Sequence, residues 1–130
     1  MRSTLWLALG VFVLTAGANI GAHHSYAGFD QDRTVSVEGT IDSVLFANPH
    51  VVLTVRVPGA SVYTVTWMSG RQLNLQGVAT ANLRAGDVVV VTGNPSRDSP
   101  ELSKITEVRR LRDGWTWRMD DGRVSVTAAR

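Results

Sequence analysis

The stretch from Val35 to His50 constrains the fold of this chain more than any other. Apolar and polar residues alternate along its first half, which predicts a strand with one buried face. Gly39 interrupts the alternation, so we expect a bulge or a sharp coil near the middle of this strand. The strand is expected to end at Phe46, and Ala47–His50 then turns the chain into the next strand. The bent strand constrains the architecture, and the loop that follows it carries a candidate functional residue, His50.

Residues 1–22 have the pattern of a bacterial secretory signal peptide. Arg2 supplies the positive charge, and an apolar run from Leu5 to Leu14 follows it. This run is shorter than the roughly 20 apolar residues that a membrane-spanning helix needs. We therefore expect a periplasmic or secreted protein with no membrane span after signal removal. An uncleaved N-terminal anchor is the alternative.

Two cleavage positions remain open. A cut after Ala18 follows small residues that suit a signal peptidase. A cut after Ala22 would place Ile20 at the −3 position, where isoleucine is less usual. With a cut after Ala22, residues 23–130 form a single domain, which is long enough to bury one modest core.

Composition narrows the classes of function. The full chain has 13 basic and 11 acidic residues and no long basic run, so nucleic acid is not expected as a partner. Arg109, Arg110 and Arg112 have acidic neighbours and are interpreted as part of a solvated strand face. The chain has no cysteine, which excludes disulfides, thiolate metal sites and thiol nucleophiles. We expect the mature domain to be a monomer.

The remaining chain predicts further strands, a short helix and a terminal hairpin. Ser69 as N-cap and Gln72 three residues later form a capping-box pattern, and Gly77 is a natural stop for a helix of about two turns. Residues 93–100 have the composition of a loop. The irregular apolar spacing of the strand after this loop implies a bulge. The expected strands after the first cover residues 51–57, 62–68, 88–91, 102–111, 115–119 and 123–127.

The order of these elements predicts the fold class. Three strands, a short helix and two strands follow the order of a small OB-like five-stranded Greek-key barrel. The protein is therefore predicted to be all-β, with one short helix and a C-terminal hairpin that turns at Asp120–Gly122. We expect this hairpin to be an appendage that pairs with an edge strand. A small open sandwich is the alternative architecture.

The three histidines carry the metal hypothesis. His23, His24 and His50 all lie at expected loop positions, and neutral imidazole is a common ligand of copper and zinc. If the signal is cut after Ala22, His23 could bind one ion through both its α-amine and its ring, as in histidine-brace copper proteins. The competing interpretation is a solvated tail with His50 bonded locally. The two ends of the first strand should lie at opposite ends of the barrel, unless the lead peptide runs back across it.

Other residues give no complete active site. Ser25 lies beside His24, but the sequence supplies no orienting acid or oxyanion hole, so no catalytic or cofactor-binding residue is assigned and an enzyme is not favoured. Trp67 is predicted to lie in the core. Trp115 and Trp117 share a strand face, and we expect them to cover an open end of the barrel.

Several motifs together resemble a family of small exported bacterial proteins of unknown function. Its members start with a His-His-Ser-aromatic segment after the signal and contain a Thr-Asn-Pro-His turn. This sequence departs from that pattern at Ala47, where threonine is usual, at Gly70–Gln72, where a Pro-Asn pair is usual, and in the hairpin after Arg112. The resemblance implies an exported β-barrel and no known activity. The motifs that carry it are His23–Tyr26, Phe29-Asp30, Val37–Ile41, Ala47–His50 and Leu83–Gly93.

Two classes of function follow. The first is a periplasmic module that binds or delivers copper or zinc through His23, His24 and His50. The second is a non-metal binding module that docks an unknown protein or glycan through its barrel face and its Trp-rich hairpin.

Overall fold

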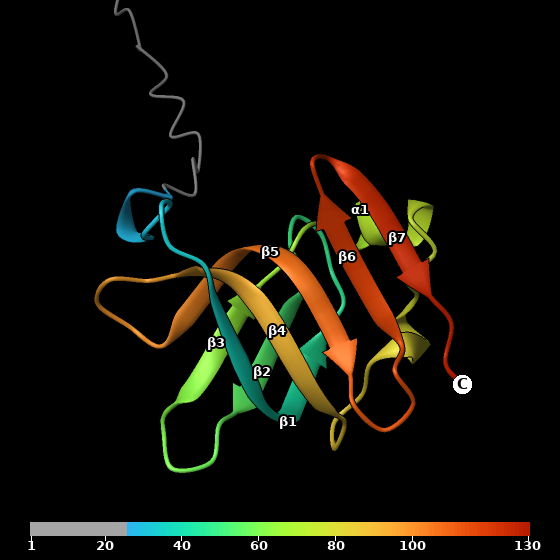
Figure 1. Ribbon diagram of the computed structural model, residues 1–130, viewed down its shortest axis with the longest axis horizontal. Helices are drawn as coiled ribbons and strands as arrows, with labels where there is room; N and C mark the ends of the chain where they lie inside the picture. The colour runs from blue at the N-terminus through green and yellow to red at the C-terminus, as the bar shows by residue number, and fades with distance from the viewer. Residues whose placement is uncertain (1–25) are drawn as a thin grey trace, which may run out of the picture.

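The computed structural model describes residues 26–130 as a small all-β structure with one α-helix (Figure 1). The predicted signal peptide, His23 and His24 lie outside the described residues. The 3-10 turns are η1 (Tyr26–Gly28) and η2 (Thr80–Asn82), and the helix is α1 (Gly70–Leu75). The strands are β1 (Val35–Leu45), β2 (Val52–Arg56), β3 (Val62–Thr66), β4 (Val88–Pro95), β5 (Glu101–Arg110), β6 (Thr116–Asp120) and β7 (Arg123–Thr127).

The first five strands close into a barrel. They lie in the order β3-β2-β1-β4-β5, and all these neighbours are antiparallel. The barrel is closed by a parallel pairing of β3 with β5, in which Thr64 pairs with Glu101 and Val65 with Leu102. The predicted five-stranded barrel with one short helix is therefore confirmed, and the open sandwich is excluded because no gap separates two sheets.

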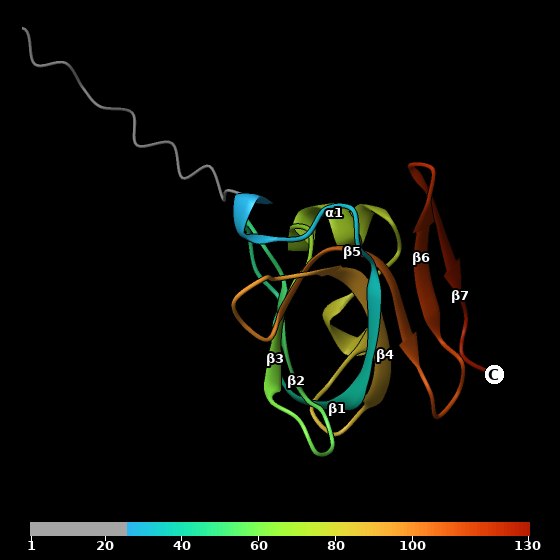
Figure 2. The same ribbon diagram turned by 60° about the vertical axis from the view of Figure 1, so that its left-hand side comes forward.

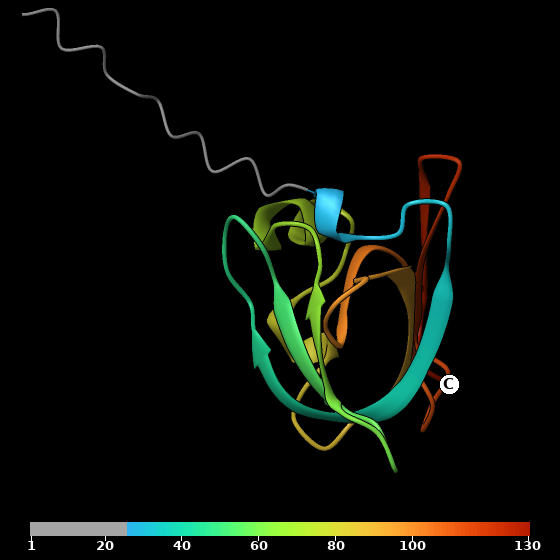
Figure 3. The ribbon, with the colours of Figure 1, turned by 90° about the vertical axis from the view of Figure 1, so that its left-hand side faces the viewer.

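Strand β1 bends so strongly that it forms a U around the barrel (Figure 3). Its first half pairs with β4 and its second half with β2, and Thr40 pairs in both directions. A Cβ at Gly39 would lie 2.4 Å from the carbonyl oxygen of Arg56, so only glycine fits where the two strands approach. The change of pairing partner falls at Thr40, next to Gly39, but the shift of register falls later, between Ile41 and Ser43.

The apolar residues that alternation places on one face of each strand form the core. The buried set includes Trp67, which is 3% exposed, and it spans every barrel strand, α1 and the C-terminal hairpin. The fully buried side chains with the largest volumes include Trp117, Ile41, Leu53 and Leu73. The placement of Trp67 in the core is therefore confirmed.

The hairpin β6–β7 is more than the expected appendage. Its tight turn at Asp121 and Gly122 has two residues with positive φ, as the sequence predicts. Strand β6 extends the sheet beyond β5, and Figure 2 shows the hairpin standing against the barrel. Trp117 is fully buried and meets Trp67 edge to face, with ring centroids 4.9 Å apart. The hairpin thus supplies part of the barrel's core.

At the end of β4 one expectation is corrected and another is confirmed. Gly93, Asn94 and Pro95 belong to the strand rather than to a loop, because β5 follows β4 beyond Gly93. A Cβ at Gly93 would lie 2.6 Å from the carbonyl oxygen of Ser103, which explains why this strand residue is glycine. The predicted bulge in β5 is confirmed opposite Gly93, where the register shifts and Lys104 has a φ of 45°.

The interpretation of the three arginines as a solvated face is wrong for Arg110. This side chain is buried and forms two hydrogen bonds with Asp113, each 2.9 Å long. Arg109 and Arg112 remain about half exposed. Successive side chains of a strand point to opposite faces, so Arg110 points inward where Arg109 points outward. At the end of β5 it meets the carboxylates of Asp87 and Asp113.

Candidate functional site

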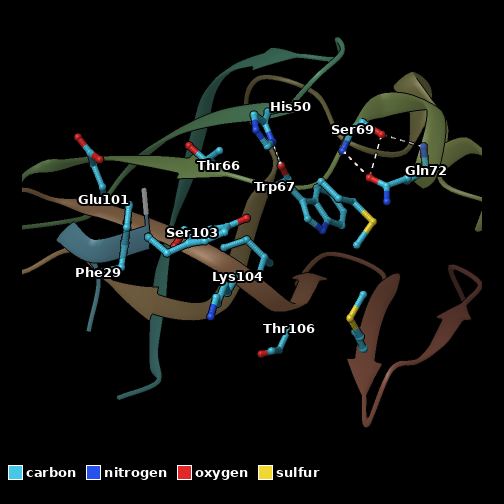
Figure 4. A pocket seen from close by; sticks show the side chains of 14 residues that line it. Phe29, His50, Thr66, Trp67, Ser69, Gln72, Glu101, Ser103, Lys104 and Thr106 are labelled. Carbon is cyan, nitrogen blue, oxygen red and sulfur yellow. Dashed lines mark hydrogen bonds between the residues drawn. The ribbon is translucent and has the colours of Figure 1, made fainter. Parts of the chain in front are cut away.

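A pocket of about 610 Å³ lies at the end of the barrel that carries α1. Its walls come from η1, the residues after β3, the bulged part of β5, and β6 (Figure 4). The sequence-predicted site residue His50 lines it, together with Trp67. The sequence predicted none of the other lining residues as part of a site. Ser103 and Lys104 have one sequence signal, the irregular apolar spacing that marks the bulge of β5.

The lead segment before β1 returns across this end of the barrel. Tyr26 and Phe29 line the same pocket as His50. Phe29 forms an isolated β-bridge with Ser96, and the backbone N–H of Asp30 donates to the carbonyl of Pro95 at 2.9 Å. The expected separation of the two ends of β1 is therefore wrong. The U-shaped bend of β1 raises both of its ends to the same end of the barrel, as Figure 3 shows.

His50 is held in a defined orientation. Its Nδ1 lies 3.0 Å from the carbonyl oxygen of Trp67. A carbonyl can only accept, so Nδ1 carries the hydrogen, and in the neutral ring the lone pair is then on Nε2. The backbone around it is also tied down, because Val51 exchanges two backbone hydrogen bonds with Trp67 and Met68, each 2.9 Å long.

The turn that carries His50 is docked on α1. The N–H of Gly70 donates to the carbonyl of Ala47 at 2.9 Å, and the N–H of Arg71 donates to Oδ1 of Asn48 at 3.1 Å. A Cβ at Gly70 would lie 2.9 Å from the ring of Phe46, so the glycine permits this close contact. The bonds to Asn48 and Ala47 satisfy N-terminal amides of the helix and fix the turn.

The N-terminal end of α1 also has the predicted capping box. Ser69 Oγ accepts from the N–H of Gln72 at 3.2 Å, and the Gln72 side chain accepts from the N–H of Ser69. Both residues line the pocket, so the helix forms part of its rim.

Two residues that line the pocket each hold a buried polar atom with no hydrogen-bond partner. These atoms are Nε1 of Trp67 and Oγ of Ser103, and both residues are 3% exposed. Figure 4 shows the Trp67 indole lying across from the strand that carries Ser103. The other indole at this end is paired, because Nε1 of Trp117 donates to Oε1 of Gln76 at 3.0 Å.

Lys104 projects from the bulge in β5 beside these groups. Its Nζ donates to Oε1 of Gln31 at 2.7 Å and lies 5.1 Å from the centre of the Tyr26 ring. Lys104 thus ties the lead segment to the pocket wall.

The opposite end of the barrel holds a buried ionic cluster. Arg110 bonds Asp113, donates to the carbonyl of Asn82, and lies 3.9 Å from Asp87. Asp87 accepts from the N–H of Arg84 at 3.0 Å and pairs with Arg112 at 3.4 Å. The hydrogen bonds from Arg110 lower the pKa of Asp113; desolvation opposes this, and the N–H of Trp115 and the nearby arginine charges reinforce it.

Residues 26–130 contain no group of three or more His, Cys, Asp or Glu side chains that could hold a metal ion. His50 is therefore the described member of the predicted ligand set, and His23 and His24 lie outside the described residues. Trp115 and Trp117 are buried, so their rings do not form an exposed surface for stacking. Within the same described part, no helix is long and apolar enough to cross a membrane.

The closed barrel, its capping helix and the pocket define a small all-β barrel protein. Comparison with known families matches residues 11–104 to DUF6152, described as a family of unknown function, and the chain belongs to this family. The match ends within β5, so the hairpin β6–β7 lies beyond it. No curated protein and no solved structure matches the chain.

Proposed function

We propose that this protein is an exported β-barrel that binds a copper or zinc ion through His23, His24 and His50. The observation that supports this proposal most is that Tyr26 and His50 line one pocket. His24 and His23 precede Tyr26 by two and three residues, and an extended chain spans at most about 3.6 Å per residue. Chain length alone therefore keeps their backbone within roughly 11 Å of Tyr26, which lines the pocket that His50 also lines.

The orientation of His50 also supports a ligand role. Metal-binding histidines commonly donate their second ring N–H to a carbonyl or carboxylate, which fixes the ring and the tautomer. The bond from Nδ1 of His50 to the carbonyl of Trp67 has this arrangement, which supports Nε2 as the proposed ligand atom. Nitrogen ligands favour copper over zinc by the Irving–Williams order.

Secretion determines which ligands the N-terminus provides. A cut after Ala22 makes His23 the first residue, so that its α-amine and ring nitrogen can join His50 on one ion. A cut after Ala18 leaves only the imidazoles of His23 and His24. Mass spectrometry of the protein exported from cells that express the full chain decides between these sites.

The test is metal affinity measured on exported protein that has no affinity tag. Copper and zinc content is determined first, and affinity then by competition with a chelator of known strength. The variants are His50→Asn and a His23→Ala/His24→Ala double change. Asparagine keeps an N–H donor near the position of Nδ1 and removes Nε2. The variant can therefore keep the hydrogen bond to the carbonyl of Trp67 while it loses the proposed ligand atom.

A shared site predicts that both variants lose affinity to a similar extent. It also predicts weaker binding in mildly acidic buffer, because each ligand nitrogen must be unprotonated. If His50→Asn binds as tightly as the parent while the double variant does not bind, the tail binds metal alone. If neither variant changes the affinity, the metal proposal fails, and a non-metal binding module takes its place.

A further inference from the structure

We infer that the pocket beside His50 binds a small, mostly apolar molecule with a neutral carbonyl oxygen, which accepts hydrogen bonds from Nε1–H of Trp67 and the hydroxyl of Ser103. The inference goes beyond metal binding and does not depend on it, because neither of these groups is a metal ligand in the proposed site.

The two unpartnered donors are the main observation. Among residues 26–130, Nε1 of Trp67 and Oγ of Ser103 are the only buried side-chain nitrogen or oxygen atoms that lack a hydrogen-bond partner. Both belong to residues that line this one pocket, although Trp67 follows β3 and Ser103 lies in β5. Burying a donor without a partner is unfavourable, and native proteins rarely keep such groups without a reason. Two of them at one cavity indicate a site for an acceptor.

The chemistry of the two groups selects the ligand atom. An indole N–H can only donate, and a serine hydroxyl can rotate to donate as well. One oxygen with two lone pairs, as in a carbonyl, can accept from both. An acceptor is therefore a better match than an amine or another donor.

The remaining walls disfavour a charged ligand. Phe29, Ile105 and Met119 supply apolar surface to the pocket. Lys104 is already bonded to Gln31, and the carboxylate of Glu101 also lines the pocket, where it would repel an anion. The volume of about 610 Å³ is that of a small-molecule site. A neutral carbonyl compound fits these conditions.

The test uses the metal-free protein, kept in chelator, and two probes of similar shape. Acetophenone has a carbonyl oxygen, and ethylbenzene does not. Binding is followed by the indole N–H resonances in ¹H–¹⁵N correlation spectra. The resonance of Trp67 should move downfield and saturate with acetophenone, while that of Trp117, already bonded to Gln76, serves as the internal control. We expect acetophenone to bind tighter than ethylbenzene by about tenfold or more, since one good hydrogen bond already gives a factor of this size and two are proposed.

Variants separate the hydrogen bonds from the cavity itself. Ser103→Ala should lower the preference for acetophenone while leaving the melting temperature equal or higher, because it removes an unpartnered buried hydroxyl. Thr106→Val is the matched control, since its hydroxyl bonds the carbonyl of Thr92 and lines the same pocket. It should leave the preference unchanged.

Three results would overturn the inference. They are a Trp67 resonance that does not move up to the solubility limit of acetophenone, equal binding of the two probes, and a preference for acetophenone that Ser103→Ala leaves undiminished. In each case the two donors are hydrated rather than ligand-binding. Because the metal is absent throughout, none of these results bears on the histidine site.

Discussion

The two ends of the barrel bury polar groups in different ways. At the end opposite α1, Arg110 and Asp87 are buried and each has several partners. At the α1 end, Trp67 and Ser103 are equally buried but keep an unpartnered donor each. Buried groups with full sets of partners are consistent with a structural role, whereas unpartnered groups beside a cavity are consistent with binding. The difference assigns stability to one end and recognition to the other.

Removing Trp67 should have the largest effect and tests whether the binding end also carries the core. Trp67→Ala removes a buried ring that contacts Trp117, and it should lower the free energy of unfolding by about 3–5 kcal/mol. Trp117→Ala should cost a similar amount, and the double variant less than the sum, because the rings share one contact. Denaturation with urea measures all three. An unchanged midpoint for Trp67→Ala would place its side chain on the surface.

Arg110→Ala tests the ionic end. It leaves Asp87 buried and without its nearest buried cation, so the free energy of unfolding should fall by roughly 3 kcal/mol or more. Arg109→Ala is the matched control, because that side chain is about half exposed, and it should change stability by less than about 0.5 kcal/mol. Equal effects of the two changes would show that the cluster is not structural.

Gly39→Ala tests the bend that brings both ends of β1 to the pocket. The added Cβ would meet the carbonyl of Arg56 at 2.4 Å, so β1 and β2 must separate at a cost of about 1–3 kcal/mol. Gly28→Ala should be nearly neutral, since no heavy atom lies within 4 Å of its Cβ position. Thermal unfolding of both variants distinguishes a required glycine from a tolerated one.

The smallest expected effect is the pH dependence of the ionic end. The pKa of Asp113 is lowered in the folded state, mainly by the hydrogen bonds from Arg110. Its contribution to stability is therefore present above the ordinary aspartate value of about 3.9 and is lost as the pH falls through the lower folded value. Asp113→Asn should be less stable at neutral pH and show a smaller loss below about pH 4. An unchanged acid profile would rule this pair out as a source of acid sensitivity.

Local patterns in the sequence predicted most of the barrel. Alternation placed the strands, Ser69 and Gln72 placed the helix cap, and Asp121-Gly122 placed the last turn, because each depends on neighbours in the chain. The bulge in β5 was also visible as broken alternation. These features need no knowledge of distant contacts.

Contacts between distant residues account for what was missed. Nothing local says that Trp117 fills the barrel core, that Arg110 turns inward to Asp87, or that the bend of β1 returns Tyr26 to His50. The broken alternation of β5 marks the region of the pocket residue Ser103 but not its role, since an unpartnered hydroxyl is defined only by its surroundings. Among the described residues, His50 is the one site residue that the sequence predicted.

The closure of the barrel has a consequence for its motions. Strand β3 meets β5 through two residue pairs, whereas β1 and β4 share six. Opening this short parallel seam breaks few backbone hydrogen bonds, so it is the least costly place for the barrel to part. Glu101 takes part in the seam and also lines the pocket. Amides of β3 and the start of β5 should thus exchange with solvent sooner than those of β1 and β4, so the wall of the pocket that contains Glu101 is expected to open first.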